Sequence, residues 1–405
     1  MDLSLQLGKK EIVMVLRFLT SGESHGPCLT AIIDGVPAGF QIQESFINKE
    51  LQKRQVGYGR GDRMKIEKDS VKILSGVRFS KSIGSPICLQ IENKDWANWQ
   101  IAMSSQEVEK TAENEQIIKE KSITKIRPGH ADYSGSIKYG HSDIRNILER
   151  SSARETTTRV AVGSVAKAIL NEFNISSYSF VTQIGKAKLS VEDHKNPDIN
   201  KIENSDLRCP SDSVYEQMKT QIDTAKEQGD TLGGSFEIRF KNVPVGLGSH
   251  VHWDRKIDGL IAQAIMSIPA VKSVEIGMGS EVAEKSGSLT HDEIYYEDGK
   301  YLRKTNNAGG IEGGMTNGEE IIIKASMKAI PTMQKALNSV CMESHQPYKA
   351  HFERSDTCAV PACAVVAEHM ASIVIANAFL EKFGQDNIDE IKMNYTNYLE
   401  TISKR

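Results

Sequence analysis

The chain has 405 residues, of which 50 are basic and 53 are acidic, and its formal net charge at pH 7 is -3. This near balance excludes a whole-chain argument for binding nucleic acid or an anionic membrane surface, so any anion binding must be local. The six cysteines are scattered without a C-x-x-C pair, which argues against a zinc knuckle or a disulfide framework and favours a reducing cytoplasm.

Residues 1–13 are interpreted as an N-terminal extension. They contain Lys9, Lys10 and Glu11 but no long apolar core and no small-residue cleavage site, so they do not resemble a secretory signal. No fixed-period repeat and no Pro-rich or Ser-rich linker divides the rest of the chain. We therefore expect a single domain over residues 14–405.

Several segments have the composition of β-strands, because they are rich in branched or aromatic residues and bounded by Gly, Pro or Asn. They are residues 71–79, 86–92, 235–245 and 320–327, and residues 15–20 form a further candidate strand near the N-terminus.

Helices are expected between these strands. Apolar residues recur at helical spacing in residues 153–173 and again in residues 257–265, before Pro269. Ser213 and Glu216 are spaced as a capping box, and Gly229 offers a stop, so residues 213–226 predict an amphipathic, peripheral helix.

The most apolar long stretch is residues 360–380. Glu368, His369 and Asn377 interrupt it, so it fits a buried helix better than a membrane span. The chain as a whole lacks the regular alternation of strand and helix that is typical of a doubly wound parallel sheet. These patterns predict an α+β fold in which antiparallel sheets pack on helices.

A glycine-rich loop at residues 57–63 carries Arg60 and Arg63 and follows closely behind Arg54. Because Arg offers paired donors in a planar fork, this loop suits a phosphate or carboxylate ligand. A solvated surface loop is the alternative interpretation. The loop is not a P-loop, since no Gly is followed by Lys-Ser or Lys-Thr at the required spacing.

A second cluster, at residues 125–133, places His130 between the cations Lys125 and Arg127 and the carboxylate of Asp132. This arrangement is a candidate proton-transfer site, although a histidine at a Pro-Gly turn can equally be an ordinary surface residue. A third cluster, at residues 150–156, puts hydroxyls and backbone N–H groups near an expected helix start, where anions bind well. A simple capping segment is its alternative.

One motif points to a different class of enzyme. Residues 22–26 (Gly-Glu-Ser-His-Gly) fit the G-x-S-x-G pattern of a serine hydrolase, and Asp356 and His369 follow Ser24 in the hydrolase order. The hydrolase turn requires a strand inside an already built parallel sheet, however, and a single candidate strand precedes Ser24. The hydrolase is therefore the weaker alternative.

Two further groups of residues suggest no separate site. His250 and His252 would point to one side of a strand, but no third metal ligand is apparent nearby, so no metal site is expected. Trp96, Trp99 and Trp253 are too dispersed to form a stacking platform for nucleic acid, and are interpreted as packing residues.

Taken together, these segments resemble the chorismate synthase family over nearly the whole chain. The matching motifs are residues 22–26, 127–132 (Arg-Pro-Gly-His-Ala-Asp), 150–156 (Arg-Ser-Ser-Ala-Arg-Glu-Thr), 267–272 (Ser-Ile-Pro-Ala-Val-Lys), 307–311 (Asn-Ala-Gly-Gly-Ile) and 354–356 (Arg-Ser-Asp). Several long motifs in the correct order are far more specific than any single glycine pattern.

The resemblance implies a carbon–oxygen lyase that carries out the reduced-FMN-dependent anti-1,4-elimination of phosphate from 5-enolpyruvylshikimate 3-phosphate. The product is chorismate, and the step is the last common one of the shikimate pathway to the aromatic amino acids. In the family mechanism the electron-rich flavin lends density as phosphate leaves and then helps accept the ring proton. Such a site must hold two anions and one flavin away from water.

The family roles carry over by motif. His25 is expected to protonate the departing phosphate, His130 to keep the reduced flavin in its required protonation state, and Asp356 to act with the flavin in removing the ring proton. The candidates to bind the phosphate and carboxylates of the substrate, or a phosphate of FMN or NADPH, are Arg54, Arg60, Arg63 and Arg127.

The flavin contacts of the family also map onto this chain. They are Arg150, Ser151, Ser152, Pro269, Ala270, Gly313, Lys328, Ala329, Ile330, Pro331, Thr332 and Arg354. Many relatives have Pro directly after the lysine that Lys328 matches, whereas this chain has Ala329 there and Pro331 two residues later.

The resemblance further implies a helical layer sandwiched between antiparallel β-sheets and a cytoplasmic homotetramer. Fungal relatives reduce their own flavin with NADPH, while many bacterial relatives depend on a separate reductase or on reducing conditions. Arg54 and Arg60 match positions associated with NADPH, but they do not separate these cases. No G-x-G-x-x-G follows an expected strand, which argues against a separate Rossmann domain.

A protein that binds flavin or anions but has lost catalysis is the remaining alternative. Such a chain would lack one of the chemical residues and keep the binding segments. His25, His130 and Asp356 are all present, so the sequence favours the active enzyme.

Overall fold

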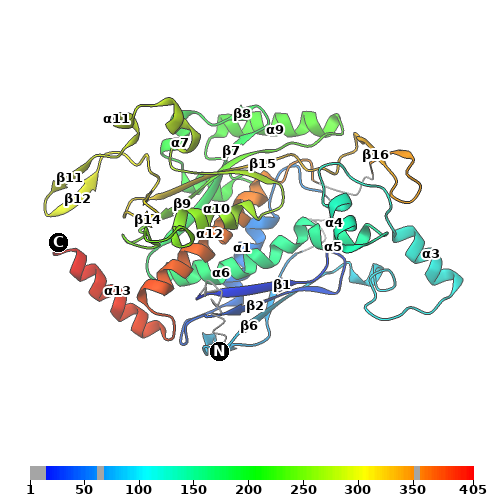
Figure 1. Ribbon diagram of the computed structural model, residues 1–405, viewed down its shortest axis with the longest axis horizontal. Coiled ribbons are helices and arrows are strands. Elements are labelled where there is room, and N and C mark those ends of the chain that lie inside the picture. Colours follow the sequence, from blue (N-terminus) through cyan, green and yellow to red (C-terminus); the bar gives the residue numbers. More distant parts are fainter. Residues whose placement is uncertain (1–14, 62–67, 351–355) are drawn as a thin grey trace, which may run out of the picture.

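A computed structural model describes residues 15–61, 68–350 and 356–405 of the chain. Two antiparallel sheets enclose a layer of helices (Figure 1). The first sheet has the order β1 (Arg17–Ser21), β2 (Cys28–Asp34), β6 (Ile87–Glu92), β3 (Val71–Ile73). The second has the order β10 (Val271–Ile276), β15 (Ile321–Met327), β9 (Gly234–Lys241), β7 (Ser176–Ile184), β8 (Ala187–Lys188).

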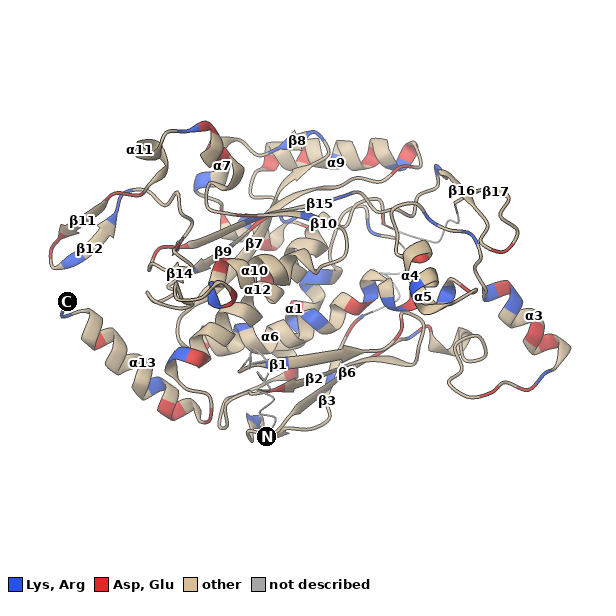
Figure 2. Ribbon diagram, in the orientation of Figure 1, with Lys and Arg blue, Asp and Glu red and all other residues tan. Residues whose placement is uncertain are grey.

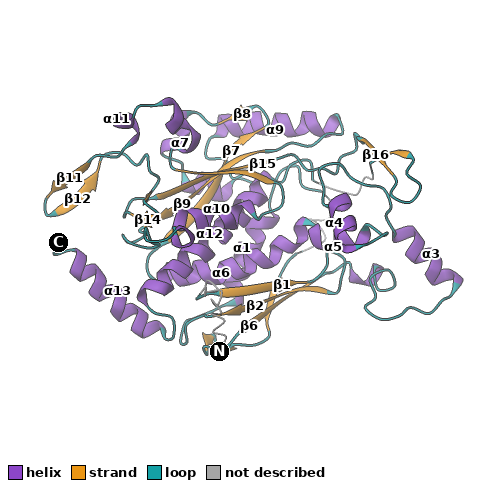
Figure 3. Ribbon diagram, viewed as in Figure 1, coloured by secondary structure: helices purple, strands orange, loops and turns teal. Residues whose placement is uncertain are grey.

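The middle layer is formed by α1 (Glu44–Gln55), α6 (Thr156–Glu172), α10 (Ile257–Met266) and α12 (Val360–Phe383). In the first sheet Leu29, Ala31 and Ile33 alternate with more exposed residues and point to this layer, as a strand with one covered face requires. Figure 3 shows both sheets with the helices between them. The predicted α+β class, with a helical layer between antiparallel sheets, is confirmed.

Helix α12 is the centre of this layer. It packs against α1, α6, α10, β7 and β9, so most of its circumference is apolar rather than one stripe. In the described part of the chain it is the helix that is long and apolar enough to cross a membrane, but its most apolar 18-residue stretch is entirely buried inside the fold. The prediction of a buried helix over residues 360–380 is therefore confirmed.

Helix α9 (Asp212–Glu227) covers the outer face of the second sheet through Val214, Met218 and Ile222. The predicted capping box is wrong, because the helix begins before Ser213 and its N-terminal flanking residue is Ser211, which has extended backbone. Asp212 then lies in the first turn, where the helix dipole favours a carboxylate. The predicted stop is confirmed, since Gly229 has a left-handed φ of 67° just past the helix end.

The remaining elements lie around this sandwich. The helices are α3 (Ala112–Lys121), α4 (Asp132–Tyr139), α5 (Arg145–Ser151), α7 (Val191–Lys195), α8 (Ile199–Asn204), α11 (Gly287–Thr290) and α13 (Ile388–Ile402). Four two-stranded hairpins are β4 (Val77–Arg78) with β5 (Lys81–Ser82), β11 (Ile294–Glu297) with β12 (Lys300–Arg303), β13 (Ile311–Glu312) with β14 (Met315–Thr316), and β16 (Asn338–Val340) with β17 (Pro347–Lys349). Both signs of charge are mixed along α3, α9 and α13 (Figure 2).

A buried ion cluster joins three helices of the middle layer. It consists of Glu50 on α1, Lys167 on α6, and Glu368 and His369 on α12. Lys167 Nζ lies 3.1 Å from Glu50 and 2.5 Å from Glu368, and Ser179 on β7 donates a hydrogen bond to Glu368. Each buried charge thus has an opposite charge or a hydrogen-bond partner, which is the condition for tolerating it inside a fold.

Candidate active site

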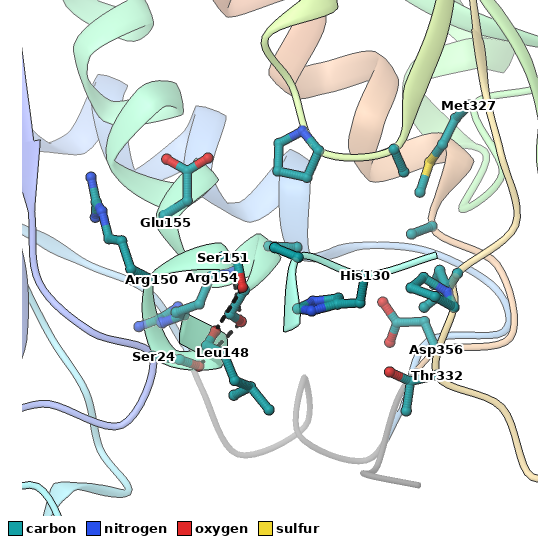
Figure 4. A pocket seen from close by; sticks show the side chains of 18 of the residues that line it. Ser24, His130, Leu148, Arg150, Ser151, Arg154, Glu155, Met327, Thr332 and Asp356 are labelled. Atoms are coloured by element: carbon teal, nitrogen blue, oxygen red, sulfur yellow. Dashed lines mark hydrogen bonds between the residues drawn. The ribbon is translucent and has the colours of Figure 1, made fainter. Parts of the chain in front are cut away.

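A cavity of about 680 Å³ opens where α5 and the start of α6 meet the loops that follow β1 and β15 and the turn that precedes β10. Figure 4 shows Ser24, Arg150 and Arg154 on one side of it and His130, Asp356 and Thr332 on the other. The predicted site residues that line it are His25, Arg54, Arg60, Arg127, His130, Arg150, Ser151, Ser152, Pro269, Ala270, Lys328, Ile330, Pro331, Thr332 and Asp356. Residues from distant parts of the chain therefore converge on one cavity.

Four predicted residues are not placed in this lining. Gly313 lies in the turn between β13 and β14, and Ala329 stands beside the lining residues Lys328 and Ile330 without lining the cavity itself. Arg63 and Arg354 lie outside the described residues. The roles expected for these residues stay predictions.

His25 is held by a buried carboxylate that the sequence did not indicate. Its ring Nδ1 lies 2.8 Å from Glu149 Oε1, and its backbone N–H donates to Glu149 Oε2 at 2.7 Å. Arg145 donates to the same carboxylate at 3.2 Å. Burial alone would raise the pKa of Glu149, but the hydrogen bond and charge of His25, together with Arg145, hold it below its ordinary value.

His130 has a matching partner in Asp132, at the first turn of α4. Its Nδ1 lies 2.5 Å from Asp132 Oδ1, and Arg127 donates to both oxygens of that carboxylate and to Thr332 Oγ1. Although burial opposes ionisation, the bonds from Arg127 and His130 lower the pKa of Asp132 far below its ordinary value. The geometry predicted for this cluster, an imidazole between a cation and a carboxylate, is present.

Asp356 lies against the glycine-rich loop. Its Oδ1 accepts a hydrogen bond from the backbone N–H of Gly61 at 2.7 Å, and its Oδ2 lies 3.2 Å from Arg60 Nε. Gly59, with a φ of 80°, bends the loop so that its carbonyl accepts from the N–H of Thr357. The loop thus holds a carboxylate and a guanidinium at the cavity wall.

Arg54 and Arg154 share one buried carboxylate, Asp69. Arg154 Nη1 lies 2.5 Å from Asp69, whereas Arg54 Nη1 is 3.8 Å from it and makes no hydrogen bond within the described residues. Burial lowers the pKa of Arg54 to about 10 even though Asp69 opposes that shift, so its guanidinium still carries its charge near neutral pH. Arg54 therefore adds a positive charge to the cavity lining.

The predicted flavin segments line the cavity from two sides, with Arg150 on one and Thr332 on the other (Figure 4). Arg150 donates to the carbonyls of Thr20 and Gly22, Ser152 Oγ donates to Ser24 Oγ, and Lys328 Nζ donates to the carbonyl of Gly129. Ala270 has a φ of 71°, a left-handed conformation that costs a side-chain-bearing residue on the order of 1 kcal/mol and that clusters at functional sites.

The serine hydrolase arrangement is not formed by the described contacts. His369 lies in the buried ion cluster, where its Nδ1 donates to the carbonyl of Val365, and Asp356 is engaged with Arg60 and Gly61. Nor are His250 and His252 on a strand as expected, because they precede a short 3-10 helix, Trp253–Arg255, and His252 pairs with Asp254. Trp99, interpreted as a packing residue, stacks on the ring of His25.

The charge of the lining is strongly unbalanced. Among the described residues, the lining contains the carboxylates of Glu155 and Asp356 and eight cations, Arg54, Arg60, Arg127, Arg150, Arg154, Arg159, Lys272 and Lys328. Asp132 and Asp69, behind the lining, pair with Arg127 and Arg154. Apolar surface is supplied by Leu148, Pro269, Met327, Ile330 and Pro331. A cavity of this size, with apolar walls, a cationic excess and two carboxylate-bound imidazoles, is typical of an enzyme site for a ligand bearing several negative charges.

Comparisons of the sequence and the structure with known proteins identify the family of enzymes to which this site belongs. A sequence model described as chorismate synthase matches residues 16–380. A chorismate synthase from Geobacter metallireducens is 53% identical over 397 residues, covering 96% of this chain and 99% of that protein, and one from Aquifex aeolicus is 52% identical, covering 96% and 98%. A crystal structure of a chorismate synthase is 44% identical with a TM-score of 0.76, covering 96% of this chain and 99% of that one.

The chain belongs to the chorismate synthase family. It is accordingly a lyase of aromatic amino acid biosynthesis, and the predicted family and enzyme class are confirmed.

Proposed function

We propose that the chain catalyses the reduced-FMN-dependent anti-1,4-elimination of phosphate from 5-enolpyruvylshikimate 3-phosphate to give chorismate. The observation that carries this proposal is the cavity itself. It brings His25, His130 and Asp356 together under an excess of cations, as a site for a phosphorylated dicarboxylate and a flavin phosphate requires.

His25 is the proposed acid for the departing phosphate. Its ring lines the cavity while Glu149 lies on its Nδ1 side, so the second ring nitrogen is on the side away from that carboxylate. A leaving phosphate gains charge as its C–O bond breaks, and a positioned proton donor lowers the cost of that charge.

Asp356 is the proposed partner in removal of the ring proton, and His130 the residue that maintains the protonation state of the flavin. Both stand on the same side of the cavity (Figure 4). Asp356 is held by a backbone N–H and by Arg60, and this contact fixes the direction of its carboxylate before substrate arrives.

The residues present fit reduced FMN. Apolar surface from Leu148, Pro269, Met327 and Ile330 suits an isoalloxazine ring, and Arg150, Ser151 and Ser152 line the same cavity. When bound, the reduced flavin supplies electron density to the reacting ring. The wall residues of this chain orient it and exclude water.

Further parts of the proposal concern the assembly and the flavin supply. We propose a cytoplasmic homotetramer whose protomers each have one catalytic domain over residues 14–405, with NADPH or a separate reductase as source of electrons. The exposed side chains of Leu19 and Ile32 on the outer face of the first sheet support association. The six cysteines are all free, which supports a reducing compartment.

The test is anaerobic turnover of 5-enolpyruvylshikimate 3-phosphate by the purified protein with chemically reduced FMN, followed by chorismate absorbance and phosphate release. Oxidised FMN serves as the control. Turnover with reduced flavin and none with oxidised flavin is the expected result, and repeating the assay with NADPH tests for built-in flavin reduction. Folded protein that binds FMN but forms no chorismate would favour the inactive binder.

A further inference from the structure

The contacts of Glu149 concentrate on the segment that carries His25. Its carboxylate meets the ring Nδ1 and the backbone N–H of His25, and its own carbonyl accepts the backbone N–H of Ser24 at 3.0 Å. Glu149 is 2% exposed and lies on α5, one residue before Arg150. A single buried residue thus fixes both the chain and the ring of a residue 124 positions away.

One face of the His25 ring is covered by Trp99. The two ring centroids are 4.0 Å apart with an interplanar angle of 31°. Lys121 Nζ and Arg145 Cζ lie 4.1 and 4.9 Å from the centroid of the Trp99 ring, so the indole is held in place by cations. The imidazole is therefore held by an aromatic ring on one face and by a carboxylate at Nδ1.

Since Nδ1 faces an ionised carboxylate at hydrogen-bond distance, Nδ1 must carry a hydrogen and donate it. The neutral form with hydrogen on Nε2 alone would set two lone pairs against each other in a buried site. A carboxylate that fixes the tautomer and orientation of an imidazole in this way is a recurring device of enzyme sites.

We infer that Glu149 is a positioning residue for the acid chemistry of His25, an inference that rests on the proposed function. Glu149 keeps the Nδ1–H bond through the reaction, so the proton delivered is the one on Nε2. In that step the C–O bond of the substrate breaks with its electron pair on the phosphate oxygen. The Nε2 proton moves to the phosphate, and His25 is left neutral with hydrogen on Nδ1.

A matched pair of carboxylates makes the inference testable. Asp132 contacts His130 in the same way as Glu149 contacts His25. The distance from Nδ1 to the carboxylate oxygen is 2.5 Å for His130 and 2.8 Å for His25. Glu149→Gln and Asp132→Asn each replace one acceptor by a neutral group of the same shape. Each variant thus serves as the control for the other.

The first measurement is ¹⁵N NMR of the histidine rings in the full-length protein. The wild type is expected to show hydrogen on Nδ1 of His25. Glu149→Gln should change the His25 ring signals and leave those of His130 unchanged, and Asp132→Asn should do the reverse. Neutral His25 with hydrogen on Nε2 in the wild type would overturn the inference, and this observation requires no variant to fold.

The second measurement is a double-mutant cycle on anaerobic turnover. Glu149→Gln is expected to lower kcat roughly 100-fold with KM changed less than about 3-fold, because the acid is misplaced while the binding groups remain. In the His25→Ala background the same substitution should change kcat less than about 2-fold. Equal effects in both backgrounds would show that Glu149 acts on the fold and not through His25.

Failure of this inference is distinguishable from failure of the proposed function. If the wild-type protein forms no chorismate, the proposed function is contradicted. If the wild type forms chorismate and Glu149→Gln is equally active, only the positioning role of Glu149 is contradicted.

Discussion

The buried ion cluster and the cavity differ in how far their charged side chains are paired with opposite charges. In the cluster Lys167 contacts two carboxylates, Glu50 and Glu368, and His369 contacts Glu50. Around the cavity several arginines are paired with carboxylates, as Arg127 is with Asp132 and Arg154 with Asp69. Arg150, Lys272 and Lys328 also line the cavity and have no ion pair among the described residues. The charges of the cluster are paired within the fold, whereas the cavity has cations that are available to pair with an anionic ligand.

The difference separates residues that hold the molecule together from residues that act on a substrate. Substitution in the cluster should cost stability, and substitution in the cavity should cost binding or rate. Cavities that bind anions hold such uncompensated charge at the expense of stability, because like charges repel until the ligand arrives. The predictions below start from the largest expected effect.

Lys167→Met is expected to destabilise the protein by about 3–5 kcal/mol, since it leaves Glu50 and Glu368 buried without their shared cation. Denaturant unfolding of the purified variant measures this loss. The control is Lys335→Met, whose side chain is 66% exposed and which should change the free energy of unfolding by less than about 0.5 kcal/mol. Equal stability of the two variants would refute a structural role for the cluster.

His130→Ala is expected to reduce kcat about 100-fold to 1000-fold while substrate still binds, because the Arg127–Asp132 pair stays in place without the imidazole. Anaerobic turnover and substrate titration measure the two quantities. His291→Ala, at an exposed histidine, serves as the control. Near-normal turnover of His130→Ala would remove His130 from the mechanism.

Asp356→Asn is expected to preserve FMN binding and slow the elimination about 100-fold, because an amide cannot accept the ring proton. Single-turnover kinetics with reduced FMN give the rate of the step directly. An unchanged rate would exclude Asp356 as the base, and loss of FMN binding would show that its contacts with Gly61 and Arg60 serve the fold.

Lowering the pH should reduce the stability that the buried ion cluster contributes, over a range that the pKa of Glu368 defines. Burial would raise the pKa of Glu368, but Lys167, His369 and Arg208 lower it from its ordinary 4.5 to about 2. A carboxylate with a depressed pKa contributes stability that is present above pH 4.5 and is lost as pH falls toward 2. In unfolding followed over this range, Glu368 alone should contribute a loss on the order of 2–3 kcal/mol, and Glu368→Gln should make the total decline smaller by about that amount. A variant with an unchanged slope would contradict the assignment.

The sequence predicted the elements that have a clear period. Residues 153–173 and 257–265 gave α6 and α10, and the apolar stretch at 360–380 gave α12. Strand β7 was missed because Ser177 and Ser179 interrupt its apolar pattern. Both serines donate to Glu368, so their burial depends on a residue nearly 200 positions away.

The site was predicted in part for the same reason. The family motifs identified His25, His130 and Asp356, and Asp132 was visible because it lies two residues from His130. Glu149 and Asp69 were not singled out, because their partners are distant in the sequence. Folding brings Glu149 to His25, and it brings Asp69 to Arg54 and Arg154. Partners that are distant in sequence leave no local pattern.

The most direct test of the central claim is the affinity of 5-enolpyruvylshikimate 3-phosphate, measured anaerobically by titration calorimetry in the presence of reduced FMN. Arg54→Gln should weaken binding at least about 10-fold in the folded fraction, because it removes a positive charge from the cavity lining. The same change also removes hydrogen bonds to Thr156 and Ala153, so its stability is measured alongside the affinity. Folded Lys167→Met should bind substrate as the wild type does. Wild-type affinity in Arg54→Gln, or weakened binding in Lys167→Met alone, would contradict the division between a balanced core and an unbalanced site.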